Sequence, residues 1–572
     1  MNHARGRHGA REYFWFALAL IILLVGSAAR AAAADDASTS AAAPNKAPPA
    51  KKKKPTVDEL EQRIRVLEEK LDEQQRATAA ALQSAQRAAT AAQESAAAAQ
   101  QAAAVPAPAA APSPSPVPSP PRTAQQQGQP HPVTEQQAGS ATESKPQIFA
   151  GPGGFSFQSI DGADQIRFHG EFDFDGRFYN DDLTPDGSRS TWLLRRARPI
   201  IEGTFGNMFD FRFNPDFAGG KTVIQDAFVA ARFNPLFVVT AGKFKVPFGL
   251  ERLQLSPNNR LIELGLPSDL VPNRDLGLQV SGTYVFASGT LTYQVGWFNG
   301  VSDGTSTDAN ATPDVDSNDD KDWVARIFAQ PFKTTDLAAL KGLGAGVAVS
   351  YVNQVGSATN TLLPTYKTET QRNFFTYDAA RDAKGAIPVA GATYADGIRM
   401  RVSPQAYYFY KSFGLLTEYV HERQDVARSV GTGGFVRRAT LKPDSWQLLT
   451  TYSLTGDDAT FGTVTPKRPY ATGQPGWGAV ELAARISELK LDPRTFTNAG
   501  NGAGNSAGNS WFADPNTQAS KATAWTVGLN WYLTQNVGWY LDYTVTHFDG
   551  GALGGADRSD EKAFFTRFQV AF

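Results

Sequence analysis

Cysteine is absent from the 572-residue chain, which excludes disulfides, thiolate metal sites and cysteine nucleophiles at once. An excess of one charge is also lacking, because 55 Lys and Arg stand against 56 Asp and Glu. The formal net charge of -1 therefore gives no reason to expect nucleic acid as a partner. After residues 13–25, no apolar run is long enough to cross a membrane as a helix. Any later crossing would have to use strands.

The N-terminus has the features of an export signal. Three arginines, Arg5, Arg7 and Arg11, precede the apolar run from Tyr13 to Val25, and small residues follow it. This order predicts a cleaved signal peptide over residues 1–34. A membrane anchor is the alternative, but the run is shorter than the roughly 20 residues that a spanning helix needs. Residues 35–55, rich in Ala, Lys and Pro, are expected to form a flexible segment.

Residues 56–100 predict a periplasmic coiled-coil helix. Thr56 and Glu59 form a capping box at its start. Apolar residues then recur at intervals of three and four: Val57, Leu60, Ile64, Leu67 and Leu71. The β-branched residues in this seam favour a coiled coil of two helices, whereas the segment from Arg63 to Glu68 resembles a motif of short trimeric coiled coils. Periodicity alone leaves the number of helices open. Residues 101–147, rich in Ala and Pro, read as an extended linker.

From residue 148 onward the sequence alternates between apolar and polar side chains with a period of two. In the final strand Phe564, Phe568 and Phe572 share one face, while Arg567 and Gln569 lie on the other. A soluble protein avoids exposing such an aromatic row, but a strand with lipid outside and water inside requires it. Residues 165–178 follow the same rule, with Ile or Phe on one face and charged residues on the other. The pattern is typical of a transmembrane β-barrel.

Sixteen such segments can be counted, an even number as single-chain bacterial barrels require. They are expected to start near residues 165, 191, 208, 223, 236, 275, 289, 322, 343, 397, 413, 444, 477, 522, 537 and 561. Short links alternate with long ones, as turns and loops do at the two ends of a barrel. One link does not fit, because Gly456 to Gly476 is long where a short turn is expected. The fold class predicted is all-β, a 16-stranded antiparallel barrel preceded by the coiled-coil helix.

Several segments resemble one known family, the phosphate-selective porins O and P. They are Trp192–Arg198, Gly242–Glu251, Gly476–Arg485, Gly528–Leu533 and Thr566–Phe572, in the family's order. The resemblance extends over residues 148–572. It implies a homotrimer of sixteen-stranded outer-membrane barrels with a loop folded into each pore, and a trimer agrees with one of the two readings of the coiled coil.

The function expected from these features is that of an outer-membrane porin for passive diffusion of small hydrophilic solutes, with small anions such as phosphate favoured. The alternative is a weakly selective or structural barrel whose N-terminal stalk contacts the cell wall. Outer-membrane lipids are the other expected partner. An enzyme is not expected, because no Gly-x-Ser-x-Gly motif or comparable nucleophile constellation is present. No cofactor or metal is predicted; the acidic run from Asp314 to Asp322 lacks the glycine of a calcium loop and reads as an external loop.

The residues that would select anions are basic side chains at a constriction. The proline-stiffened segment Val246–Arg274 joins two strands and is expected to bend into the lumen. The candidate pore-lining and anion-binding residues are Arg195, Arg196, Arg198, Lys243, Lys245, Arg252, Arg260 and Arg274. Guanidinium groups match phosphate oxygens with paired donors. The alternative role for these residues is to pair with lumen carboxylates and brace the wall.

Overall fold

The computed structural model describes residues 146–180, 190–220, 222–300, 319–358, 360–378, 391–430, 435–497 and 511–572. The predicted signal peptide, the coiled coil and nearly all of the linker lie outside these residues, as does most of the acidic run that starts at Asp314. Within the described ranges, no helix is both long and apolar enough to cross a membrane.

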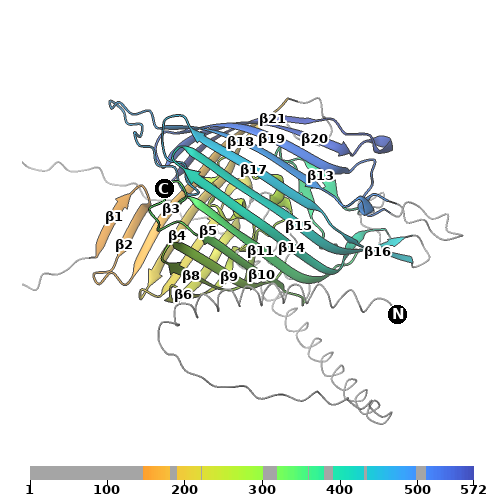
Figure 1. Cartoon of the computed structure of the whole chain (residues 1–572), viewed down its shortest axis with the longest axis horizontal. Helices are drawn as coiled ribbons and strands as arrows, with labels where there is room; N and C mark the ends of the chain where they lie inside the picture. Colours follow the sequence, from red (N-terminus) through yellow and green to blue (C-terminus); the bar gives the residue numbers. More distant parts are fainter. Residues whose placement is uncertain are drawn as a thin grey trace, which may run out of the picture. The chain divides into compact units, whose positions relative to one another are not determined.

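In the described part of the chain, sixteen antiparallel strands form a closed ring, in which each strand pairs with the next in sequence order (Figure 1). The strands are β3 (Gln165–Tyr179), β4 (Thr191–Phe205), β5 (Phe209–Asp216), β6 (Val223–Asn234), β7 (Phe237–Lys245), β8 (Arg274–Phe286), β9 (Gly289–Phe298), β10 (Asp322–Gln330), β11 (Leu343–Val355), β14 (Thr393–Tyr410), β15 (Phe413–Val430), β17 (Asp444–Ser453), β18 (Ala479–Lys490), β19 (Ala519–Tyr532), β20 (Val537–Gly550) and β21 (Glu561–Ala571). The ring closes where β21 pairs with β3, from Ala563 opposite Tyr179 to Ala571 opposite Glu171.

Among the described residues, five further strands lie outside the ring of sixteen. The hairpin of β1 (Gln147–Gly151) and β2 (Gly154–Gln158) extends the sheet beside the start of β3. Strand β16 (Phe435–Leu441) pairs with the end of β15. Strands β12 (Thr365–Lys367) and β13 (Asn373–Thr376) form a separate hairpin. The short helices are α3 (Leu250–Leu253), η1 (Ala218–Gly220), η2 (Ser256–Asn258), η3 (Leu266–Asp269), η4 (Pro493–Thr495) and η5 (Leu553–Gly555).

The two faces of the wall carry the side chains that the alternation predicts. Phe172 and Phe174 on β3 are exposed on the outside, whereas the neighbouring Glu171, Asp173 and Asp175 are buried in the lumen. A closed antiparallel sheet permits this arrangement because all its ladder hydrogen bonds are made within the wall. The lumen is thus a polar core, built from charged side chains that pair with one another.

The strand count and the fold class of the barrel are confirmed, and each strand starts within a few residues of its expected position. The long link between β17 and β18 is an excursion at the end of the barrel where neighbouring links are short turns. This end, marked by the links β4–β5, β6–β7 and β14–β15, is called the turn end below. The opposite end, where the long segments 246–273 and 356–392 begin, is called the loop end.

Candidate functional site

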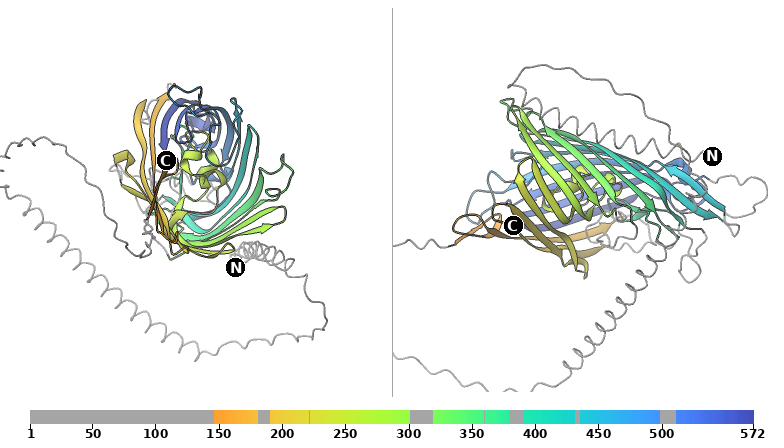
Figure 2. Two further views of the ribbon diagram at one scale, coloured as in Figure 1. Left: turned by 90° about the vertical axis from the view of Figure 1, so that its left-hand side faces the viewer. Right: turned by 90° about the horizontal axis from the view of Figure 1, so that it is seen from below.

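The lumen is crossed by the segment 246–273 between β7 and β8, as the sequence predicts (Figure 2). This segment is called the inner loop. It has little regular structure, and nearly all of its side chains are buried against the inner wall; Leu255 is an exception. Four prolines restrict the backbone along this stretch. The inner loop therefore narrows the barrel by filling much of it.

One side of the inner loop is bound to β15, β17 and β18. The guanidinium of Arg485 contacts Glu251 Oε1 at 2.9 Å and donates to the carbonyl of Glu263 at 2.9 Å. The backbone N–H of Leu250 donates to Glu418 Oε2 at 2.7 Å. Gly265 lies so close to the wall that an added Cβ would come within 2.0 Å of Gln447 Oε1. These contacts fix the middle of the inner loop against the wall.

The other side of the inner loop is bound near the seam of the barrel. Ile262 donates its N–H to Asp542 Oδ2 at 2.6 Å, and its carbonyl accepts from Arg567 at 3.1 Å. Glu263 forms an ion pair with Arg177 at 2.5 Å. Because both sides are anchored by charge-assisted hydrogen bonds, the inner loop is a fixed part of the wall.

The excursion 454–478 at the turn end also enters the lumen. Arg260 of the inner loop donates to the carbonyls of Thr460 and Gly462 at 2.6 and 2.7 Å. Phe461 stacks on Tyr407 of β14 with ring centroids 5.0 Å apart. Thr463 donates to Asn258 Oδ1 at 3.0 Å. The link between β17 and β18 is thus longer than a turn because it forms a second segment, which meets the inner loop inside the barrel.

The loop end is filled by aromatic packing around the β12–β13 hairpin. Tyr366 stacks on Phe375 with centroids 5.4 Å apart, and Phe375 meets Phe496 edge-on. The hairpin connects to the inner loop where Lys367 donates its N–H to Asp269 Oδ2 at 3.0 Å. Burial raises the pKa of Asp269 to about 8, against the smaller opposing effect of that hydrogen bond.

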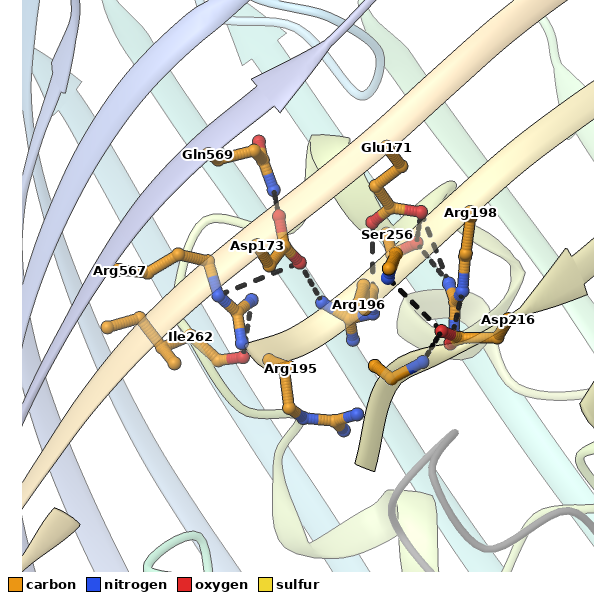
Figure 3. A network of polar contacts seen from close by, with 12 residues as sticks. Glu171, Asp173, Arg195, Arg196, Arg198, Asp216, Ser256, Ile262, Arg567 and Gln569 are labelled. Atoms are coloured by element: carbon orange, nitrogen blue, oxygen red, sulfur yellow. Dashed lines mark hydrogen bonds and ion pairs between the residues drawn. The ribbon is translucent and has the colours of Figure 1, made fainter. Parts of the chain in front are cut away.

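Three of the predicted basic residues lie together on β4 (Figure 3). A β-bulge occurs here, because Asp173 pairs with Arg196 and the next residue of β3 pairs with Leu194. The extra residue lets both Arg195 and Arg196 point inward, which strict alternation does not predict. Arg196 pairs with Asp173 at 2.6 Å, and Arg195 lies 3.6 Å from Glu263.

Arg198, the third of the basic residues on β4, contacts two carboxylates and a hydroxyl. Its distances are 2.7 Å to Asp216, 3.2 Å to Glu171 and 3.0 Å to Ser256 Oγ of the inner loop. Each arginine on this part of β4 thus has a carboxylate within ion-pair range. These contacts fit the alternative role given above, in which the basic residues pair with lumen carboxylates and brace the wall.

The remaining five predicted residues are dispersed around the inner loop. Lys245 donates to the carbonyls of Arg252 and Gln254 at 2.7 and 2.5 Å. Arg252 donates to the carbonyl of Ser268 at 2.8 Å, and Arg274 pairs with Asp226 at 2.8 Å. Arg260 contacts the excursion, as described above. Lys243 is buried on β7.

A cavity of about 600 Å³ lies between the inner loop, the excursion and the wall. Residues of β3 to β9 and of β19 to β21 line its wall side, and the cavity reaches the turn end near Pro152 and Phe572. Of the eight predicted residues, only Lys245 and Arg274 line it. The other charged or titratable lining residues are His169, Glu171, Glu202, Arg212 and Asp226, besides tyrosines.

Sequence reasoning missed the arginines on the later strands. Arg399 pairs with Glu422 at 2.8 Å and Arg401 with Asp322 at 2.9 Å, and both arginines are fully buried. The period-two spacing of these two arginines in β14 was a signal that could have placed them on the inner face. The described residues contain no group of three acidic or histidine side chains that could hold a metal ion.

A family model described as phosphate-selective porin O and P matches residues 165–572. Among solved structures, the chain is similar to the outer membrane channel DcaP of Acinetobacter baumannii, with 10% identity, a TM-score of 0.41, and coverage of 73% of this chain and 99% of that one. It is also similar to OmpT, an outer membrane protein of Vibrio cholerae, with 11% identity, a TM-score of 0.39, and coverage of 72% and 98%. It is similar as well to OprB of Pseudomonas putida, with 10% identity, a TM-score of 0.38, and coverage of 72% of this chain and 95% of that one. No curated protein matches the sequence.

Proposed function

Because the chain belongs to the phosphate-selective porin O and P family, an outer-membrane porin family, we propose that its cavity passes small hydrophilic solutes by passive diffusion. The observation that supports this proposal is the cavity between the inner loop, the excursion and the wall, into which charged side chains of β3 to β8 face. A pore of this kind needs fixed polar groups that bind a solute weakly enough to release it. Catalysis is not part of the proposal.

The charges at the cavity favour weak ion selectivity. Three carboxylates, Glu171, Glu202 and Asp226, line it together with three basic residues, Arg212, Lys245 and Arg274. Selectivity for one sign requires an excess of the opposite sign in the lumen. Since acidic and basic groups pair here, neither ion is strongly attracted or excluded.

The second candidate function is a channel that prefers small anions, phosphate among them. The observation that favours it is the convergence of Arg212, Lys245 and Arg274, from three different strands, on one cavity. A guanidinium group offers five N–H donors, so it can bind a passing oxyanion while it stays paired with a carboxylate of the wall.

Reversal potentials in planar bilayers under a KCl gradient separate the two candidates. A value near zero supports weak selectivity, and a value close to the chloride potential supports anion preference. Inhibition of the chloride current by added phosphate would show that phosphate binds in the pore. Absence of any current from pure, folded protein would contradict the channel proposal itself.

We also propose that the protein is a homotrimer, supported by the family resemblance and by the trimer motif between Arg63 and Glu68. The N-terminal stalk would then lie in the periplasm, where it can contact the cell wall. Cross-linking of the full chain in its native membrane measures both the trimer and any link to peptidoglycan.

A further inference from the structure

A continuous row of alternating charges follows the wall of the cavity. Glu202 on β4 pairs with Arg212 on β5 at 2.7 Å, and Arg212 lies 3.5 Å from Asp226 on β6. Asp226 in turn pairs with Arg274 on β8 at 2.8 Å. These four residues are called the charge row. Each neighbour along the row has the opposite sign.

The charge row leads from the turn end toward the inner loop. Glu202 lies close to the turn end of β4, whereas Arg274 begins β8 directly after the inner loop. Side-chain exposure falls in the same direction, from 19% and 21% at Glu202 and Arg212 to 9% and 7% at Asp226 and Arg274. The row thus leads from more exposed side chains near the turn end to more buried ones beside the inner loop.

A polar atom beside the row is left without a hydrogen bond. Asn214 donates its Nδ2 to Asp226 at 2.9 Å, but its Oδ1 has no partner among the described residues although it is buried. A buried amide oxygen of this kind favours a solute with an N–H or O–H donor. Asn214 also lines the cavity.

The alternation decides which solutes the row can attract. A simple cation or anion meets equal numbers of like and opposite charges, so its net electrostatic attraction is small. A solute with an ammonium and a carboxylate can place each end against the opposite charge of the wall. The wall charges are already paired with one another, so each is only partly available to the solute. The solute is therefore held weakly, as transport requires.

We propose that the charge row binds small zwitterionic solutes, the class to which amino acids belong, and guides them to the inner loop. The inference rests on the proposed channel function and specifies its solute. The cavity volume of about 600 Å³ lies within the roughly 300–1,000 Å³ of small-molecule sites, so a small amino acid fits with its water.

The test measures uptake of labelled glycine, acetamide and acetate into vesicles that contain the full-length protein. The three probes are similar in size and differ in charge. Wild type is expected to take up glycine several-fold faster than acetamide or acetate. The double variant Glu202→Gln/Arg212→Gln keeps the net charge of the wall and removes half of the row, so glycine uptake should fall to the acetamide rate.

The matched control is Asp210→Asn/Arg232→Gln. This pair also joins two neighbouring strands, at 2.8 Å, but does not line the cavity. It should leave the ratio of glycine to acetamide uptake unchanged. Acetamide uptake above that of protein-free vesicles reports, for every variant, that the barrel has folded.

The outcomes separate the two proposals. If no probe enters wild-type vesicles faster than protein-free vesicles, the channel function is wrong. If acetamide enters and glycine is no faster, or if the Glu202→Gln/Arg212→Gln variant keeps the wild-type ratio, the charge row does not recognise zwitterions. A ratio that favours acetate above both other probes would also overturn the inference and would support anion preference.

Discussion

Arg567 and Asp175 join the last strand of the barrel to its first, across 392 residues of sequence. The arginine donates from Nε and Nη2 to the two carboxylate oxygens at 2.7 and 2.8 Å, and both side chains are buried. The same guanidinium lies 3.7 Å from Asp173 and holds the carbonyl of Ile262 in the inner loop. One side chain thus connects the seam of the barrel and the element that narrows it.

Replacing this arginine should destabilise the closed barrel. Arg567→Met leaves two buried carboxylates without their common counter-charge, and breaking a buried pair in this way costs about 3–5 kcal/mol. The thermal unfolding midpoint in detergent micelles should therefore fall clearly below that of wild type. The exposed pair of Arg232 and Asp210 supplies the control, because Arg232→Gln should cost less than about 1 kcal/mol. Equal shifts for both variants would contradict the role given to the seam.

Arg485 is expected to control the position of the inner loop. Its guanidinium contacts Glu251 at 2.9 Å and Glu369 at 2.7 Å, so Arg485→Met releases the inner loop and leaves two buried carboxylates unpaired. Single-channel recordings should show larger current fluctuations than wild type while the barrel stays folded. Arg494→Met, at an ion pair outside the lumen, is the control and should leave the current noise unchanged.

Shortening the excursion should widen the pore from the turn end. A variant that replaces residues 457–475 with a short Gly/Ser turn removes the carbonyls that Arg260 holds and the ring that stacks on Tyr407. The single-channel conductance should rise because the excursion borders the cavity through Thr463 and Thr465. An unchanged conductance in a folded variant would show that the narrowest point lies elsewhere.

The stability of the fold around Asp269, where the inner loop meets the β12–β13 hairpin, should decrease as pH rises. The pKa of Asp269 is raised to about 8 by burial, whereas an exposed aspartate titrates near 3.8. Between these pH values the folded state holds a proton that the unfolded state has lost, so stability decreases with pH and levels off above pH 8. Hydrogen exchange of residues 246–273 measures this effect. Asp269→Asn should reduce the pH dependence between pH 5 and 8.

The coiled-coil prediction can be tested independently of the barrel. Deleting residues 57–71 should weaken the proposed trimer without abolishing it, because the family resemblance implies that the barrels themselves also associate. Size-exclusion chromatography with light scattering in detergent gives the mass of the protein. A fully monomeric deletion variant would instead make the stalk the main assembly element.

The outward and inward faces were predictable because alternation reports a local property of each strand. Phe172 and Asp173 must point to opposite sides of any strand that contains them. The inward direction of Arg195 was not predictable in this way, because the bulge that turns it inward is seen only in the pairing of β3 with β4. The sequence placed the inner loop in the lumen. It also showed that the link from Gly456 to Gly476 is unusually long, but it did not predict that residues 454–478 enter the lumen from the turn end.

The sequence by itself determined a barrel of sixteen strands, since the period of two, the turn lengths and the oily face are properties of consecutive residues. Tertiary structure decided which charges meet. Arg274 reaches Asp226 from a strand 48 residues later, and Arg567 reaches Asp175 only because the ring closes. Ion pairing depends on the distance between two side chains in space, and the order of residues along a strand does not give that distance. For that reason the basic side chains could be named from the sequence, while their partners and the open cavity could not.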